Sequence, residues 1–525
     1  MIDVCLISDG EKTCPQGVES TNRGTEAFVK IATAASWVAG ALLSVYFMAS
    51  WPRFCIAAVF VVCAMAACGS RRIRICAAQA VRWIDSHPSI AFLVLCSMTV
   101  VVYVGLAKYF GISLSDKQFS DYKRIWQGVQ QLMSGTWPVS KSWTSTVFYA
   151  FAAWCSGGRL EAAVLGGIVL HFLSGLLAFD IARKLGGPLS GVAFAAFILL
   201  SPILVLMSFK TSTENLYVFF VLCLLWIIAK VETSELSFRW LCLGGVVLWC
   251  TVWSRGEGVV AWATFLAWAG IYSLSRKYSW RRIAASFFVL AMIFALGAVF
   301  AVAVNLRTQG VGTFLCSNDN MWPRLIGANQ KFNGRCNRED KPMIRDMMIR
   351  DGIGVNGEKT PSGRDVLDFM PAASGCPVEA LPYVKAEISR RWASMDFRAK
   401  IRFVWRKWHV AWHGDDMAEY CSVWLPRDNV HEFCQRRKVQ LMVELFPSLI
   451  ALGCILFHVV VATRRMRFAW AVLAVQILML GHFAILAVTE VSPRYGIVFN
   501  VACALPAALA VGCLRNQTTG KGRTE

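Results

Sequence analysis

The sequence has 525 residues, of which 56% are hydrophobic and only 16% charged, and its mean hydropathy is positive. In soluble domains about a quarter of all residues are charged, so this composition argues against a soluble domain and indicates a polytopic membrane protein. The net charge of +20 would suit nucleic-acid binding, but Lys and Arg stand in short clusters between apolar runs, as topology determinants do, so nucleic acid is the weaker interpretation.

The chain begins with a polar stretch, residues 1–27, that includes acids. It lacks the basic start and early apolar core of a signal peptide, so the first apolar run is predicted to stay as an anchor. A helix that crosses about 30 Å of hydrocarbon needs about 20 mostly apolar residues. We predict an all-α fold with about twelve spans, GT-C-like as the resemblance below implies, at 28–49, 52–68, 89–111, 160–182, 189–207, 214–230, 239–253, 257–274, 283–305, 441–462, 468–489 and 495–514.

The positive clusters set the predicted orientation, because short cytoplasmic loops carry an excess of Lys and Arg. With the N-terminus inside, five clusters fall on the cytoplasmic side: "RRIR" (71–74), Arg183 with Lys184, "RKYSWRR" (276–282), "RRMR" (464–467) and the tail with Arg515, Lys521 and Arg523. The short loops on the opposite side are nearly bare of positive charge, with Lys210, Arg255 and Arg494 standing alone in them. Both termini are therefore predicted to be cytoplasmic.

One apolar piece, "WTSTVFYAFAAWC" (143–155), is short, and crossing there would place Arg183 outside. It is predicted to be a juxtamembrane or re-entrant helix on the outer face. The organisation that follows is a cytoplasmic tail (1–27), N-terminal membrane helices (28–111), a first outer loop (112–159), a membrane core (160–305), a mixed polar extracytoplasmic domain (306–440), C-terminal membrane helices (441–514) and a cytoplasmic tail (515–525).

The first outer loop contains "FSDYKRIWQGVQQLMSGTWP" (119–138), an amphipathic segment too short to span. Its apolar residues recur at helical spacing and Gly135 and Pro138 end the pattern, so we predict an interfacial helix. Ser120 is a plausible N-cap, and an acid in the first turn suits the helix dipole. Capping alone is thus a complete structural explanation of Asp121.

Charged residues also stand at the outer ends of three predicted spans. Each is an ordinary helix end by itself, but together carboxylates and isolated arginines gather on the face where positive charge is sparse. That pattern suggests an anion site with carboxylates for base or orienting roles. Its candidate residues are Glu214, Arg255, Glu257, Glu490, Arg494 and Tyr495.

The extracytoplasmic domain offers weaker motifs. Gly352, Gly354 and Gly357 match GxGxxG, but no apolar strand precedes them, which disfavours a dinucleotide site. His409 and His413 are four residues apart without HExxH, so metal ligation is the minority interpretation. The segment around them, 397–412, is rich in Trp and Arg and is predicted to lie on the membrane surface. This domain has five cysteines, some of which could pair in an oxidising compartment with a connectivity that the sequence leaves open: Cys316, Cys336, Cys376, Cys421 and Cys434.

In this order the motifs resemble the GT-C superfamily of membrane glycosyltransferases, most of all the bacterial relatives of protein O-mannosyltransferases and aminoarabinose transferases. The resemblance covers about residues 112–514 and is carried by the acid-led helix of the first outer loop, "SPILVLMSFKTSTENLY", "WSRGEG", the late "PRY" and "LIGANQKFNGRCNRED". It implies a polyprenyl-phosphate-linked sugar as donor and a glycan, lipid or protein as acceptor, on the outer face of a bacterial cytoplasmic (inner) membrane.

The resemblance also implies roles for the candidate residues. Asp121 would be the catalytic base that takes the proton of the acceptor hydroxyl in an inverting transfer. Arg255 and Arg494, with Lys210 and Tyr495, would hold the donor phosphate. Glu214 and Glu257 would orient the acceptor or a basic residue, and a role of Glu214 in binding a divalent metal stays open. Protein O-mannosyltransferases carry an Asp-Glu pair where Tyr122 follows Asp121 here, which argues against a protein acceptor.

Two other classes compete with the enzyme: a transporter or flippase for lipid-linked sugars, and a membrane oligosaccharide polymerase or ligase. Transporters tend to place charges at the midplane and to show inverted repeats. Here the charges stand at helix ends and no repeat is visible, while the long loop has no His motif typical of a ligase. The sequence therefore favours the glycosyltransferase.

Overall fold

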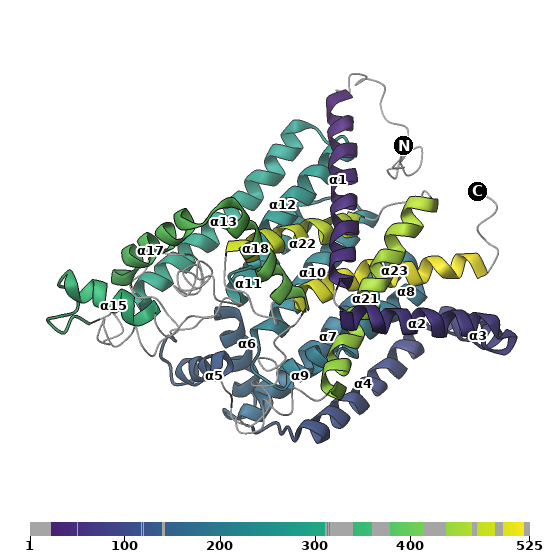
Figure 1. The fold of residues 1–525 in the computed structure, drawn as a ribbon, viewed down its shortest axis with the longest axis horizontal. Coiled ribbons are helices and arrows are strands. Elements are labelled where there is room, and N and C mark those ends of the chain that lie inside the picture. The colour runs from purple at the N-terminus through teal and green to yellow at the C-terminus, as the bar shows by residue number, and fades with distance from the viewer. Residues whose placement is uncertain are drawn as a thin grey trace.

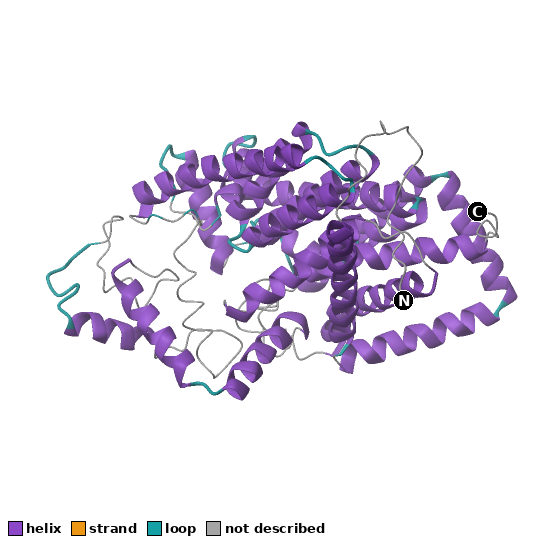
Figure 2. Ribbon diagram, turned by 90° about the horizontal axis from the view of Figure 1, so that it is seen from above, coloured by secondary structure: helices purple, strands orange, loops and turns teal. Residues whose placement is uncertain are grey.

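The computed structural model describes residues 23–49, 51–116, 118, 120–138, 142–309, 312, 314, 340–359, 378–413, 437–464, 470–488 and 497–518. The elements within these ranges are helices (Figures 1 and 2). This agrees with the predicted all-α fold. The five cysteines of the extracytoplasmic domain lie outside the described residues.

The predicted apolar segments coincide with helices because each is long and mostly apolar, and two of these helices contain an internal proline, Pro447 and Pro506. Eleven of them are single helices: α1 (Arg23–Met48), α2 (Trp51–Gly69), α4 (Pro88–Phe110), α7 (Leu160–Gly186), α10 (Thr213–Thr233), α11 (Phe238–Ser254), α12 (Gly258–Ser275), α13 (Trp280–Gln309), α21 (Arg437–Arg464), α22 (Trp470–Val488) and α23 (Ile497–Thr518).

The predicted span 189–207 is not one continuous helix but two, α8 (Pro188–Leu199) and α9 (Pro202–Ser208), which meet at 56°. Pro202 has no N–H to donate, and its ring disfavours helical geometry at the residue before it. Ser201 is accordingly extended, with φ −63° and ψ 113°. The break turns the chain toward the linker 209–212, which leads into α10.

By length and composition eight described helices can cross a membrane, and ten spans result if each of two bent pairs, α8 with α9 and α2 with α3 (Arg71–Ser86), counts as one. The shorter apolar helices, α11 and residues 497–513 of α23, stand at the other two predicted positions. The chain is therefore an all-α, multi-pass membrane protein.

Helix α3 was not predicted, since its first residues are the basic cluster "RRIR". The side chain of Ser70 accepts the N–H of Ile73 at 3.5 Å and caps this amphipathic helix. The basic cluster thus begins a helix rather than forming a plain loop.

Outside the apolar segments the predicted helices of the first outer loop are present as α5 (Ser120–Met133) and α6 (Trp143–Trp154). The extracytoplasmic domain contributes α15 (Asp340–Arg350), the 3₁₀ turn η2 (Val378–Ala380), α17 (Leu381–Ser394) and α18 (Phe397–His413). The three glycines of the GxGxxG match follow α15 in a turn, each with positive φ. Their role there is conformational.

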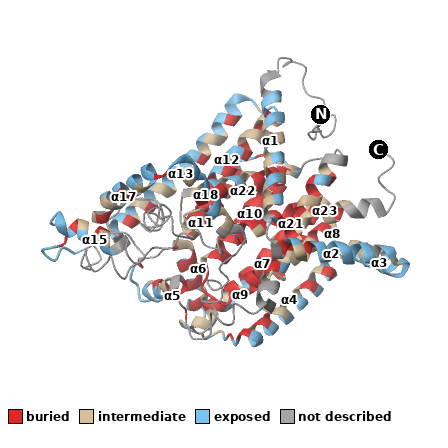
Figure 3. Ribbon diagram, viewed as in Figure 1, coloured by how far each residue is buried: buried red, intermediate tan, exposed pale blue. Residues whose placement is uncertain are grey.

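The buried core lies where α7, α8, α10, α21, α22 and α23 pack together, whereas α2 and α3 are largely exposed (Figure 3). Small residues allow close helix approach: a Cβ on Gly453 of α21 would lie 2.6 Å from that of Ala507 in α23. A buried ion pair at 2.6 Å, Arg53 with Glu444, ties α2 to α21. This bundle fixes the helix ends that form the pocket described next.

Candidate functional site

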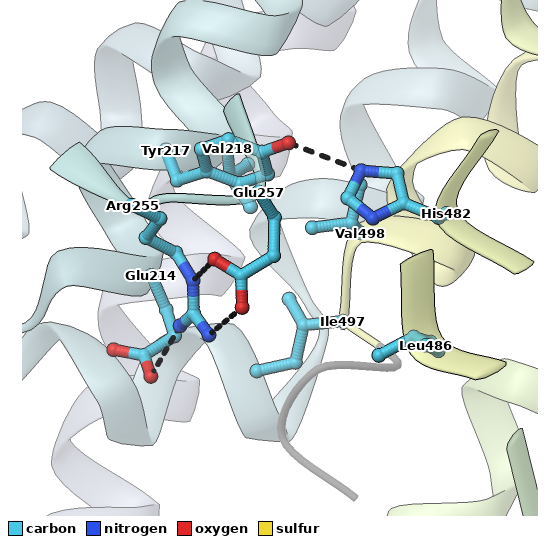
Figure 4. Close-up of a pocket in the computed structure, with 9 residues that line it drawn as sticks. All are labelled: Glu214, Tyr217, Val218, Arg255, Glu257, His482, Leu486, Ile497 and Val498. Atoms are coloured by element: carbon cyan, nitrogen blue, oxygen red, sulfur yellow. Dashed lines mark hydrogen bonds and ion pairs between the residues drawn. The ribbon is translucent and has the colours of Figure 1, made fainter. Parts of the chain in front are cut away.

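A pocket opens where α10 begins, α11 ends, α12 begins, α22 ends and α23 begins. Its lining combines charged and apolar side chains: Glu214, Tyr217, Val218, Arg255, Glu257, His482, Leu486, Ile497 and Val498 (Figure 4). On the charge-based topology all five helix ends lie at the outer face. Three of the predicted site residues, Glu214, Arg255 and Glu257, therefore come together here.

Arg255 lies between the two carboxylates. Its Nη1 donates to Glu214 Oε1 at 2.8 Å, while Nε and Nη2 donate to the two oxygens of Glu257, each at 3.3 Å. The side chains are only 11%, 4% and 21% exposed for Arg255, Glu214 and Glu257. Burial raises the pKa of Glu257, but the charge and hydrogen bonds of Arg255 outweigh burial and hold that pKa below its ordinary value. Glu257 is therefore a carboxylate at neutral pH.

The short turn between α11 and α12 holds Arg255 and Glu257 in place. Arg255 ends α11 in an extended conformation, φ −151° and ψ 141°, and its N–H donates to the Thr251 carbonyl at 3.0 Å. The Gly258 N–H donates to the Arg255 carbonyl at 2.9 Å. A Cβ at Gly258 would lie 2.4 Å from the backbone of Thr251, so the "WSRGEG" turn requires glycine there.

Glu214 is fixed at the first turn of α10. The Ser212 hydroxyl caps the helix by accepting the N–H of Glu214 at 3.1 Å and that of Asn215 at 3.4 Å. Glu214 Oε2 in turn accepts from the hydroxyls of Ser212, at 2.9 Å, and Thr213, at 3.1 Å. The acid is thus both a first-turn residue, as its helix position predicts, and a rigid partner of Arg255.

Lys210 lies in the linker between α9 and α10 and is only 1% exposed. Burial lowers the pKa of its ammonium group, and the negative charge of Asp116 partly opposes this. A buried ammonium without water is costly, so this position favours an anionic ligand nearby.

The same linker holds the start of α5, the helix that carries Asp121. The Thr211 N–H donates to Gln118 Oε1 at 3.2 Å, and the Thr211 hydroxyl donates to the Tyr122 carbonyl at 2.9 Å. The Tyr122 hydroxyl reaches Met207 Sδ in α9 at 3.2 Å. The first turn of α5 is therefore anchored at Thr211, three residues before Glu214, although the Asp121 side chain itself lies outside what the structure describes.

Two pocket residues were missed as site candidates. His482 Nε2 and the Tyr217 hydroxyl are 3.0 Å apart, and both side chains are buried in the pocket wall (Figure 4). His482 lies within the predicted span 468–489, and its partner Tyr217 is on the neighbouring helix α10. The sequence could have indicated Tyr217 as a pocket residue, because it follows Glu214 by three residues and so lies on the same face of the helix.

The remaining predicted residues, Glu490, Arg494 and Tyr495, belong to the segment 489–496, which lies outside the described residues. That segment joins Val488 of α22 to Ile497 of α23, and Ile497 lines the pocket. His409 and His413 are both in α18. Within the described ranges, no group of three or more His, Cys, Asp or Glu side chains is placed to hold a metal ion.

The fold and the pocket define a class: a multi-pass helical membrane protein with a buried charged pocket at one end of its bundle. No protein-family model matches the chain, and no curated protein matches it. Solved structures of ArnT from Cupriavidus metallidurans do match at 15% identity over 80% of this chain. The apo structure is covered to 78% with a TM-score of 0.31, and the complex with undecaprenyl phosphate to 77% with a TM-score of 0.34.

TM-scores of this size describe a loose superposition.

Proposed function

We propose that the protein is an integral membrane glycosyltransferase of the GT-C type, which moves a sugar from a polyprenyl-phosphate carrier to an acceptor hydroxyl at the non-cytoplasmic face. The acceptor oxygen attacks the anomeric carbon, the bond from that carbon to the phosphate oxygen breaks, and configuration inverts. Asp121 takes the hydroxyl proton, and the polyprenyl phosphate leaves with the bonding electrons. Such assistance by a general base contributes roughly 10²–10⁴ to the rate.

The observation that carries the proposal is the placement of two cations of low exposure beside an acid-led helix. Arg255 contacts Glu214 in the first turn of α10, and Lys210, in the linker between α9 and α10, lies four residues before Glu214. The same linker anchors the start of α5. A phosphate leaving group needs positive charge rather than an acid, and guanidinium and ammonium groups supply it. Arg494 and Tyr495 complete this phosphate site in the proposal.

The two carboxylates of the pocket take an orienting role. Their oxygens already hold the guanidinium of Arg255 from two sides, so of the roles that the resemblance leaves open, orienting a basic residue fits best. A metal between Glu214 and Glu257 would have to replace that guanidinium. The proposal therefore assigns them to Arg255 and needs no metal at this position.

The remaining assignments follow the charge pattern and the resemblance. The protein would reside in a bacterial cytoplasmic membrane with both termini inside, and act on a glycan or lipid of the cell envelope, a protein acceptor being disfavoured by Tyr122. Mannose is one sugar that the resemblance suggests for the donor.

The decisive experiment measures transfer from a panel of radiolabelled polyprenyl-phosphate sugars in membranes, with wild type and Asp121→Asn. The amide keeps the size and much of the capping ability of the acid but removes its basicity. We expect transfer by wild type and a loss of roughly 10²–10⁴ in the variant at equal expression. Lys123→Gln, an exposed change on the same helix, serves as the control.

Other outcomes identify the competing classes. Equal transfer by both proteins would leave Asp121 as a helix cap. Protected uptake of the lipid-linked sugar into sealed vesicles without transfer would indicate a flippase, and products that lengthen by repeating units would indicate a polymerase or ligase.

A further inference from the structure

Helix α18 packs against the membrane bundle mainly through one face. Phe403 and Lys407 are 8% and 1% exposed on that face. Trp408 Nε1 donates to the Phe483 carbonyl in α22 at 2.9 Å, and the two rings meet edge-on with centroids 4.7 Å apart. The helix is thus a fixed part of the molecule rather than a free appendage.

A second face of α18 is apolar yet exposed. Phe397, Ile401 and Trp405 follow one another at intervals of four residues and are 77%, 55% and 52% exposed. A stripe of this kind on a soluble surface would be a liability, whereas at a bilayer it inserts among the acyl chains near the headgroups.

Beside the apolar stripe runs a basic one. Arg398, Arg402 and Arg406 each follow an apolar residue of the stripe by one position, and all three are exposed. Arg398 and Arg402 line an open cleft together with Ile401 and Trp405. No acid in the described part of the chain pairs with these arginines. Guanidinium groups one helical turn apart, beside exposed apolar side chains, match a phosphate that is attached to an apolar chain.

The helices that contact α18 indicate its depth in the membrane. The ring of Trp405 meets that of Tyr46, in the last turn of α1, with centroids 4.8 Å apart, and Trp408 contacts Phe483, near the end of α22. The charge-based topology places both of these helix ends at the outer face. On that topology both contacts put α18 at the headgroup level of the outer leaflet.

We propose that α18 binds an anionic phospholipid of the outer leaflet, with Arg398 and Arg402 on its phosphate in the cleft and with Phe397, Ile401 and Trp405 among its acyl chains. The occupant is a lipid rather than a soluble anion, because the cations and the apolar stripe are adjacent on one helix. This binding does not depend on the proposed transferase activity.

The test uses the purified full-length chain in nanodiscs of phosphatidylcholine that contain a trace of photoactivatable phosphatidylglycerol. After illumination, labelled peptides are mapped by mass spectrometry. We expect adducts on residues 397–406 that unlabelled phosphatidylglycerol displaces and additional phosphatidylcholine does not. The double variant Arg398→Gln/Arg402→Gln should weaken this labelling on the order of tenfold, because each basic group near an anionic surface adds several-fold to binding.

The matched control is Arg350→Gln/Arg390→Gln, which removes two exposed charges from α15 and α17 of the same domain and should label as wild type does. Labelling of 397–406 that is equal with phosphatidylcholine, or equal loss in both double variants, would overturn the proposal in favour of general charge attraction. Absence of adducts on α18 in wild type, with protein-protein cross-links there instead, would assign the face to a partner protein. Displacement of the label by phosphatidylglycerol in wild type tests the lipid site directly, so the test remains valid even if a variant folds poorly.

Discussion

The burial of Lys210 is hard to explain as a contribution to the stability of the folded protein. A lysine that is 1% exposed loses hydration, and its lowered pKa reports that loss. Burying an ammonium group is costly unless it is paired and hydrogen-bonded, so an apolar side chain of similar size should be tolerated or stabilising at this position. We infer that binding of an anion, rather than folding, retains this ammonium group.

Lys210→Met should therefore raise the melting temperature of the purified protein while weakening the donor complex. Loss of a charge-assisted contact to phosphate costs about 1.5–3 kcal/mol, which is about 10- to 100-fold in donor affinity. Thermal unfolding and the donor KM measure the two effects. Lys359→Met, at an exposed position, is the control. A lower melting temperature with an unchanged KM would make Lys210 a structural residue.

Glu257 should make stability depend on pH in the acid range. The pKa of this carboxyl is below its ordinary value in the folded protein, so its ion pair with Arg255 contributes above the unfolded pKa of about 4.3 and is lost as pH falls through the folded value. The melting temperature of wild type should fall more between pH 6 and pH 3 than that of Glu257→Gln. Parallel curves for the two proteins would contradict this assignment.

At the scale of elements, the geometry of the pocket depends on how tightly the turn between α11 and α12 is packed. Its tightness depends on Gly258, where a Cβ would be 2.4 Å from the Thr251 backbone, a contact that no side-chain movement relieves. This turn also sets the direction in which the side chains of Arg255 and Glu257 point. A change that never touches a charged group should therefore disturb the pocket.

Gly258→Ala should lower stability by about 1–3 kcal/mol, as overpacking does, and lower transfer by about 100-fold if Arg255 is displaced by about 1 Å. Gly270→Ala is the matched control on the same helix, since a Cβ there meets Phe287 at an ordinary 3.4 Å. Transfer assays and thermal unfolding compare the two variants. Equal activity in both would show that the turn tolerates the added methyl group.

At the scale of the whole molecule, the pocket and α18 lie at one end of the bundle, and the charge pattern predicts that this end is extracytoplasmic. Epitope tags at the N-terminus and in the turn 352–358 test the prediction. In sealed, right-side-out vesicles, protease should remove only the tag at 352–358, and the N-terminal tag should become accessible after permeabilisation. The reverse pattern would place the pocket on the cytoplasmic side and exclude the proposed transfer at the outer face.

Residue patterns that are local were predictable. The helices α5 and α6 and the helices of the apolar segments follow from runs and spacings that each segment carries by itself. The break at Pro202 is also local, yet apolar residues on both sides concealed it. Helix α3 was missed for the opposite reason, because its basic first turn resembles a connecting loop.

The sequence by itself determined that this is a helical membrane protein, where its helices lie and which ends carry charge, because hydrophobic runs and basic clusters act over one helix length. Only the tertiary structure decided which ends meet. Arg255 contacts Glu214, which is 41 residues away in the sequence, and Tyr217 contacts His482, which is 265 residues away. Such contacts depend on how the helices pack. Helix packing is the sum of many close contacts between small and large side chains, and no single segment of the sequence contains it.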